Sequence, residues 1–228
     1  MPSAFFWTIC LAHLLGDYPL QTDRMAVAKR TWPGLTLHVA IHLFVLLVLV
    51  GSAAAVLWPY LLALAGVHFA IDAFKNRMSL LRPQAAVRLY VFDQGLHLLS
   101  LIGVALWAGS AGALVGLARA YLLPESWAIV GCGLVFVTFM WGISERIFFH
   151  KRTGFVAEVA PQKWPRMAVR ALVYGMIVLA GLAMLPSTSL VVAATALPYV
   201  AGVYRRQALM SDVVTPVLTA GAVLMLLR

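Results

Sequence analysis

Long apolar runs separated by short polar segments are the main pattern of this chain. The runs are close to the about 20 residues that a helix needs to cross the hydrocarbon core of a bilayer. Prolines, glycines and charged residues mark their ends, as expected for helix boundaries. We therefore predict an all-α polytopic membrane helix bundle with about eight transmembrane helices. The predicted spans are residues 3–18, 34–51, 56–76, 86–108, 127–146, 169–186, 189–204 and 213–227.

The composition agrees with a membrane protein and excludes a soluble catalytic fold. Apolar residues make up 63% of the 228 residues, charged residues make up 11%, and the mean hydropathy is +0.92. Too little polar surface is available to cover a water-soluble domain. The two cysteines, Cys10 and Cys132, lie in apolar runs and predict neither a disulfide framework nor a thiolate metal cluster.

The net charge of +9 indicates membrane topology and contact with lipid headgroups, and we expect no nucleic-acid partner. Four connecting segments hold 15 of the 17 Lys and Arg residues, and the positive-inside rule places these segments in the cytoplasm. Both termini then lie on the opposite side. Residues 110–123 are apolar but short, so we predict a short outer-face helix there, interfacial or re-entrant. The four basic segments are residues 21–33, 75–88, 144–170 and 205–206.

Histidine and aspartate residues in the first four predicted spans occur in pairs spaced i, i+4. This spacing places both side chains on one face of a helix. Residues 1–100 contain nine His and Asp residues, and a random distribution of these nine would give roughly 0.7 such pairs, whereas four are present. The predicted topology places all four pairs in the cytoplasmic leaflet. The pairs are His13 with Asp17, His38 with His42, His68 with Asp72, and Asp93 with His97.

Eight buried His and Asp side chains at one depth are costly unless they neutralise one another, and a divalent cation does this well. We expect zinc first, with manganese or iron as alternatives, because all three bind imidazole and carboxylate ligands. Eight ligands exceed the four of one tetrahedral ion, so some are outer partners or two ions are bound. A metal-free proton or ion relay remains open, as does a purely structural pairing such as Asp72 with Lys75.

Four short motifs carry a resemblance to a known family. They are HxxGDxxLQTD from His13, HxxxH from His38, HxxxD from His68 and DQxxH from Asp93. In this order they resemble a bacterial multi-pass membrane family of unknown function over roughly residues 4–108. The resemblance implies a multi-pass protein of the bacterial inner membrane and names no reaction. We therefore divide the chain into a His/Asp-bearing domain, residues 1–108, and additional transmembrane helices, residues 109–228, for packing, partner binding or substrate shaping.

The leading functional hypothesis is a metal-dependent hydrolase of a lipid-like phosphoester at the cytoplasmic leaflet. One of Asp17, Asp72 or Asp93 would be the general base, and the other His and Asp residues would hold the ion. Membrane lipids are the expected partners, and basic residues on the same face would bind an anionic headgroup. The alternatives are a cation or proton transporter or channel subunit, and a structural subunit of a membrane complex. The expected headgroup-binding residues are Arg24, Lys29, Lys75, Arg77 and Arg88.

Charged residues near two predicted helix ends in the second half of the chain are expected to have structural roles. Glu145 and Arg146 lie near the end of a predicted span, where a surface ion pair is expected. Asp212 follows Ser211 at the start of the last predicted span and is expected to cap that helix.

Overall fold

The computed structural model of the chain describes residues 2–117, 120–148, 163–182 and 206–228, and the regular structure in these ranges is helical. The chain divides into two compact units, Met1–Ala128 and Ile129–Arg228, which are considered separately below. The prediction of an all-α protein is confirmed for the described residues.

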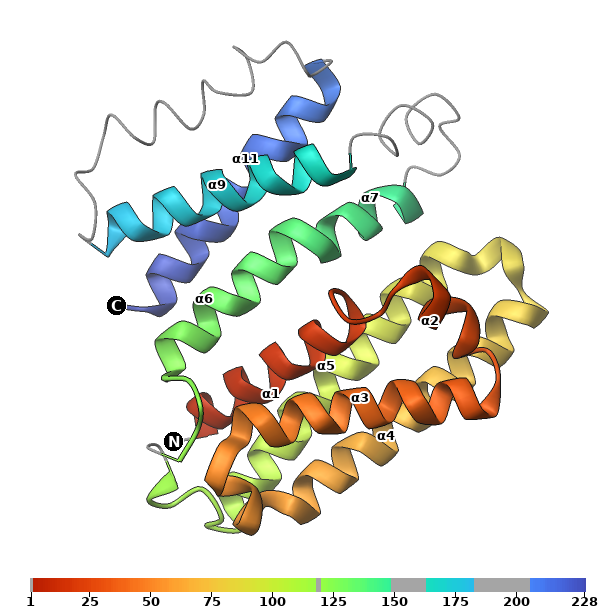
Figure 1. Cartoon of the computed structure of the whole chain (residues 1–228), viewed down its shortest axis with the longest axis vertical. Helices are drawn as coiled ribbons and strands as arrows, with labels where there is room; N and C mark the ends of the chain where they lie inside the picture. Colours follow the sequence, from red (N-terminus) through yellow and green to blue (C-terminus); the bar gives the residue numbers. More distant parts are fainter. Residues whose placement is uncertain (1, 118–119, 149–162, 183–205) are drawn as a thin grey trace. The chain divides into compact units, whose positions relative to one another are not determined.

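The first unit is a four-helix bundle with one short additional helix (Figure 1). Helices α1 and α4 each pack against both α3 and α5, so the four long helices form a closed ring around a common core. The short helix α2 packs against α3. These helices agree with the first four predicted spans to within a few residues at each end. Their bounds are α1 Pro2–Asp17, α2 Asp23–Ala28, α3 Trp32–Val50, α4 Ala54–Leu81 and α5 Ala86–Ser110.

By length and composition, three helical stretches among the described residues can cross a membrane, which is fewer than the eight predicted. The first, Trp32–Leu81, contains both α3 and α4, which are joined at the left-handed Gly51 with a φ of 60°. The other two are Pro83–Ser110 and Glu125–Phe148. Two further apolar stretches, Ser3–Asp17 and Ser211–Leu226, have fewer than 18 residues and are not counted among the three. The predicted span 189–204 lies outside the described residues.

The predicted outer-face helix at 110–123 is wrong for the described residues. The chain forms turns after Ser110, because Gly112 and Gly116 adopt φ values of 70° and 76°, which are incompatible with a right-handed helix. The segment then returns to the end of α3, where the Leu122 amide donates a 2.9 Å hydrogen bond to the Leu49 carbonyl. It therefore closes one end of the bundle as an irregular connection.

Helix α2 is positioned by local signals at both of its ends. The Thr22 hydroxyl accepts a 3.2 Å hydrogen bond from the Met25 amide and caps the start of the helix. At the other end α3 passes so close that a Cβ on Gly34 would lie 2.0 Å from the Ala28 carbonyl oxygen. Asn76 of α4 donates a 2.7 Å hydrogen bond to the Lys29 carbonyl. These contacts fix Lys29, the residue after α2, beside α4.

The second unit contains a long interrupted helix and two helices that pack together. Helix α6, Glu125–Val135, continues through a π-helical turn, Phe136–Met140, into α7, Trp141–Phe148. Helix α9, Lys163–Gly181, packs against this turn and against α11, Arg206–Leu226. Both α9 and α11 begin six or more residues before the predicted spans, which brings Arg166 inside a helix. The end of α6, α7, α9 and α11 thus form the described core of this unit.

Candidate metal centre

All eight predicted His and Asp ligands meet inside the bundle of the first unit. Each of the four long helices contributes its i, i+4 pair, and every one of these residues is between 1% and 8% exposed. The helical period explains the pairs, and the closed ring of helices explains why four separate pairs share one core. The sequence therefore identified a real cluster of buried polar side chains.

Asp17 is the centre of the tightest part of this cluster. Its Oδ1 atom lies 3.2 Å from His38 Nε2 and 3.3 Å from His42 Nε2. The same oxygen lies 3.9 Å from His68 Nε2, and the Nε2 atoms of His38 and His68 are 3.4 Å apart. A tetrahedral ion with bonds of about 2.0 to 2.1 Å holds neighbouring ligand atoms about 3.3 to 3.5 Å apart. These four side chains, here called the Asp17 set, therefore fit the ligands of one metal ion.

A second group of possible ligands adjoins the Asp17 set in the same core. Ligand atoms of Asp72, Asp93 and His97 lie within 4.8 Å of one another and can also hold an ion. We call these three residues the His97 set. His13 belongs to neither set, although its ligand atom lies within 4.8 Å of those of His68 and His97 in a third possible ligand group, and its Nε2 lies 3.4 Å from Asp17 Oδ2. His13 can thus orient the Asp17 carboxylate.

Three buried atoms of the cluster have no hydrogen-bond partner among the described residues: His42 Nε2, His97 Nε2 and Asp93 Oδ1. Leaving one buried polar atom unsatisfied costs about 1 to 3 kcal/mol. Three such atoms within one cluster are therefore unfavourable unless something binds them. A cation that accepts their lone pairs would remove this cost.

Gly16 allows the His42 ring to lie directly against α1. A Cβ atom at position 16 would lie 2.5 Å from the Cε1 and Nε2 atoms of His42, which is closer than real Cβ contacts. The glycine of the HxxGD motif is therefore explained by the close approach of an imidazole. Any side chain here would displace His42 from Asp17.

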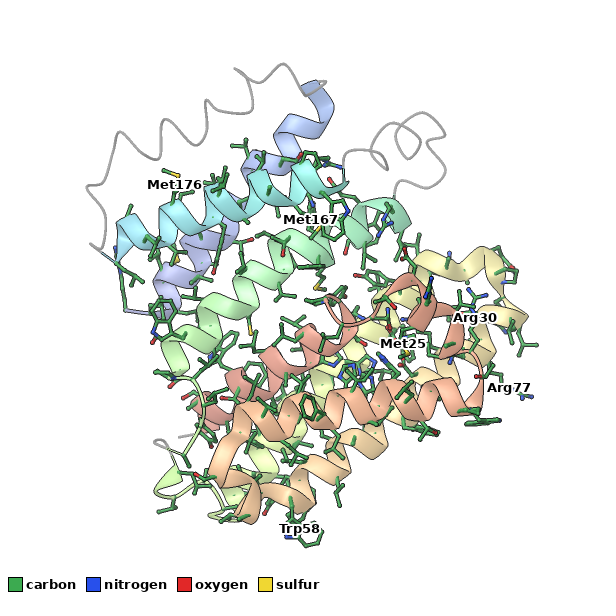
Figure 2. The ribbon with its side chains drawn as sticks, in the orientation of Figure 1. Met25, Arg30, Trp58, Arg77, Met167 and Met176 are labelled. Atoms are coloured by element: carbon green, nitrogen blue, oxygen red, sulfur yellow. The ribbon has the colours of Figure 1, made fainter. Side chains whose placement is uncertain are left out.

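The five predicted headgroup-binding residues divide into two groups. Arg24, Arg77 and Arg88 are exposed, and Figure 2 shows Arg30 and Arg77 toward the same end of the first unit. Lys29 and Lys75 instead point into the cluster. Lys29 Nζ lies 3.2 Å from Asp72 Oδ2, and Lys75 Nζ lies 2.5 Å from Asp93 Oδ2. The sequence placed Lys75 beside Asp72, but the ammonium group bonds a carboxylate of α5.

Gln94 is a member of the cluster that the sequence analysis missed. The Gln94 side chain donates a 3.0 Å hydrogen bond to Asp93 Oδ2 and accepts a 2.9 Å bond from the Tyr18 hydroxyl. The Tyr18 hydroxyl also lies 3.2 Å from the Tyr90 hydroxyl, within hydrogen-bonding distance. The adjacency of Gln94 to Asp93 was the available signal.

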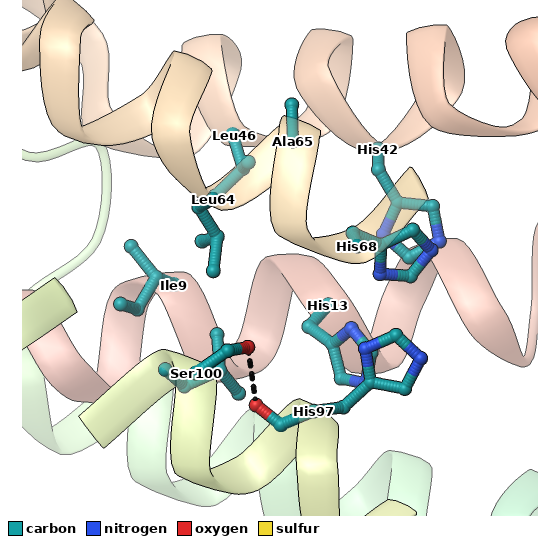
Figure 3. A pocket seen from close by; sticks show the side chains of 10 residues that line it. Ile9, His13, His42, Leu46, Leu64, Ala65, His68, His97 and Ser100 are labelled. Atoms are coloured by element: carbon teal, nitrogen blue, oxygen red, sulfur yellow. Dashed lines mark hydrogen bonds between the residues drawn. The ribbon is translucent and has the colours of Figure 1, made fainter. Parts of the chain in front are cut away.

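A small cavity of about 10 Å³ lies beside the histidines (Figure 3). Its polar wall is formed by four imidazoles, and its Ser100 hydroxyl is engaged by a 2.7 Å hydrogen bond to the His97 carbonyl. The remaining wall is apolar. The imidazoles are those of His13, His42, His68 and His97, and the apolar lining residues are Ile9, Leu46, Leu64, Ala65 and Leu101.

The second unit contains a separate buried ion network that the sequence did not predict. Glu145 is 2% exposed, so the expected surface ion pair with Arg146 is wrong, and Asp212 is 0% exposed and does not cap α11. Arg166 bonds Asp212 at 2.7 Å and 2.8 Å, and Arg170 bonds Glu145 and Asp212 at 2.6 Å each. The signal in the sequence was the i, i+4 spacing of Arg166 and Arg170 within an apolar segment.

Comparison with known proteins places the first unit in a family and gives no reaction. No curated protein and no solved structure matches the chain. A family profile matches residues 5–120, which adds about a dozen residues to the stretch that the four motifs covered and includes all eight His and Asp ligands. With half of its length matched, the chain belongs to the family described as protein of unknown function (DUF3307).

Proposed function

We propose that this protein is a membrane-embedded, metal-dependent hydrolase that acts on a lipid-like phosphoester at the cytoplasmic leaflet. The observation that carries this proposal is the Asp17 set, in which three imidazole nitrogens surround one carboxylate oxygen at the spacing of metal ligands. These groups are buried in a bundle of apolar helices, where eight ionisable side chains are expected to serve a function.

The donor set favours zinc, because three imidazoles and one carboxylate are typical of tetrahedral zinc. Manganese and iron remain alternatives, since both accept the same nitrogen and oxygen ligands. A divalent ion in this position would have to accept a fifth ligand, as catalytic zinc does in some transition states, in order to polarise a phosphoryl oxygen or acidify a water molecule. His13 and Lys75 lie outside the set, and Lys75 bonds Asp93.

We assign the general base to His13 rather than to a carboxylate. Asp72 and Asp93 each bond a lysine ammonium, which stabilises the ionised carboxylate and makes it a weak base, and Asp17 would bind the ion. His13 lines the pocket, and its Nε2 faces Asp17 Oδ2, so the other ring nitrogen can accept a proton. In the reaction, a water oxygen bonds to phosphorus, one water proton passes to His13, the ester P–O bond breaks, and His13 returns that proton to the departing alkoxide.

The substrate class follows from the two kinds of surface around the ligands. Apolar side chains lie beside the histidines, among them Leu46, Leu64 and Leu101, and side chains of this kind contact the hydrocarbon chain of an amphiphile. The exposed Arg24, Arg77 and Arg88 suit an anionic headgroup at the membrane surface. An amphiphile with a phosphate ester satisfies both.

The test is metal loading followed by turnover. The full-length protein in detergent is stripped with a chelator, reloaded separately with Zn²⁺, Mn²⁺ or Fe²⁺, and analysed for bound metal. Release of inorganic phosphate is then measured with phosphatidic acid and a polyprenyl phosphate. We expect stable metal binding and metal-dependent phosphate release, both lost in His42→Ala and retained in His150→Ala, which changes the one histidine outside the four pairs. Failure of every ion to bind would refute the proposal, and binding without turnover on either lipid would refute the hydrolase reaction.

One observation favours a proton relay as the second candidate. The rings of His42 and His68 have centroids 4.0 Å apart, those of His68 and His97 are 4.4 Å apart, and those of His97 and His13 are 4.7 Å apart. A continuous row of imidazoles can pass a proton along its length. Proton flux into liposomes from metal-free protein would support this alternative over the hydrolase.

A further inference from the structure

The three residues of the His97 set have the geometry of a second group of metal ligands, and none of them belongs to the Asp17 set. His97 Nε2 lies 3.6 Å from Asp93 Oδ1 and 4.0 Å from Asp72 Oδ1. Ligand atoms around one ion with bonds of about 2.0 to 2.2 Å are about 3.3 to 3.6 Å apart at tetrahedral angles. The shorter distance matches this spacing, and a small rotation of the Asp72 carboxylate would bring the longer one within it.

Two of these atoms lack a hydrogen-bond partner among the described residues. Asp93 is 2% exposed and His97 is 1% exposed, yet Asp93 Oδ1 and His97 Nε2 make no hydrogen bond. They lie near each other without bonding, and His97 lines the pocket. In the tautomer that leaves His97 Nε2 unprotonated, these two buried atoms can both donate a lone pair to one cation.

The two inward lysines leave these atoms available. Lys29 bonds Oδ2 of Asp72 and Lys75 bonds Oδ2 of Asp93, so in both aspartates the Oδ1 atom is the one nearer His97. A carboxylate that binds a metal through one oxygen is commonly hydrogen-bonded through the other. The lysines therefore act as positioning residues for the two carboxylates.

We infer that the cluster binds a second divalent cation through Asp72 Oδ1, Asp93 Oδ1 and His97 Nε2. This inference rests on the proposed function, because it adds an ion to the same hydrolytic site. Three protein ligands leave an open coordination position, as in catalytic sites, whereas the four ligands of the Asp17 set fill a tetrahedron. The two sets adjoin, since His38 Nε2 lies 3.3 Å from Asp72 Oδ2. The structure thus assigns a metal position with four protein ligands to the Asp17 set, and a metal position with three protein ligands and one open coordination site to the His97 set.

The second ion also sharpens the substrate class. The three carboxylates of the cluster exceed its two ammonium groups by one negative charge when the imidazoles are neutral. One divalent ion leaves an excess of one positive charge, and two ions leave an excess of three. A site with this charge binds a phosphate group that carries two negative charges, such as a phosphomonoester, more strongly than a diester. The open position next to the pocket is where its oxygens would bind.

The experiment counts ions in the full-length protein in detergent. Chelator-stripped protein is reloaded with Mn²⁺, dialysed, and analysed by elemental analysis and electron paramagnetic resonance. We expect two ions per chain in the unaltered protein, with the exchange-coupled spectrum of a metal pair. Asp93→Asn and His97→Gln should each bind one ion with the six-line spectrum of isolated Mn²⁺. Asp23→Asn, which changes an exposed aspartate outside the cluster, should still bind two.

The outcomes separate the two proposals. One ion per chain in the unaltered protein, with no exchange coupling, overturns the second ion and leaves the proposed function standing. No bound ion overturns both. The count in the unaltered protein does not depend on the folding of any variant. If Asp93→Asn and His97→Gln both elute as folded protein and retain two ions, the assigned ligands are wrong.

Discussion

The two units bury charged groups in opposite ways. In the second unit, Arg166, Arg170, Glu145 and Asp212 balance one another, and none of their buried side-chain atoms lacks a partner within the described residues. In the first unit the cluster is dominated by imidazoles, and three of its buried atoms lack partners. A saturated network needs no ligand and holds helices together, whereas an unsaturated network is suited to binding one. The comparison indicates structural cohesion in the second unit and ligand binding in the first.

The largest effect is expected from Asp17→Asn in the first unit. The amide is neutral and presents only one acceptor, so the Asp17 set loses its anionic ligand. Loss of an outer partner alone costs about 10- to 100-fold in metal affinity, and loss of a direct ligand should exceed about 100-fold. Elemental analysis should show one ion fewer per chain and phosphate release should stop. Unchanged metal content in Asp17→Asn would exclude this residue as a ligand.

The next largest effect tests the second unit. Asp212→Asn leaves Arg166 and Arg170 with only one carboxylate, and breaking a buried ion network typically costs about 3 to 5 kcal/mol. We expect this decrease in the free energy of unfolding, measured in detergent by tryptophan fluorescence, without any change in bound metal. A loss of metal from Asp212→Asn with unchanged stability would reverse the roles assigned to the two units.

Gly16→Ala should have an intermediate effect on the first unit. The added methyl group must displace the His42 ring, because it would lie 2.5 Å from that ring. We expect metal affinity to fall by about 10- to 100-fold, as for other changes that reorient a ligand. Titration against a competing chelator measures this shift. Gly66→Ala on α4 is the matched control, since a Cβ there meets nothing within 4 Å, and an equal loss in both variants would contradict the explanation.

The smallest effect concerns the pocket. Ala65→Leu fills part of its apolar wall, and Ala65 provides no ligand atom. We expect metal binding to be unchanged and turnover of a long-chain phosphoester to fall by about 10-fold, as is typical of small changes in an apolar pocket. A short, water-soluble phosphoester serves as the comparison. Equal loss of activity on both substrates would show that the pocket does not bind the hydrocarbon chain.

The sequence predicted the cluster of buried His and Asp residues because its signal is local. A pair such as His68 and Asp72 lies on one helical face by geometry alone, and four pairs at one depth imply a shared core. The helix positions followed in the same way from apolar periodicity. The exception at 110–123 arose because its apolar character resembled a helix, while the backbone conformations of Gly112 and Gly116 break one.

The missed contacts depend on tertiary structure. Lys29 reaches Asp72 only because α2 folds back against α3, which requires the Thr22 cap and the close approach at Gly34. Glu145 and Asp212 lie 67 residues apart in the sequence, and neither has a local partner that would reveal its burial. Charged residues near predicted helix ends were therefore assigned to the surface, although two of the acids and two of the arginines are buried.

The most direct test of the central claim, that the first unit holds a divalent ion on histidine ligands, is X-ray absorption spectroscopy at the zinc edge of the zinc-loaded protein. We predict nitrogen and oxygen ligands at about 2.0 to 2.1 Å with the outer-shell scattering of several imidazoles, and no sulfur ligand at about 2.3 Å. The imidazole scattering should decrease in His42→Ala. Protein that retains no zinc, or zinc whose spectrum lacks imidazole scattering, would contradict the account.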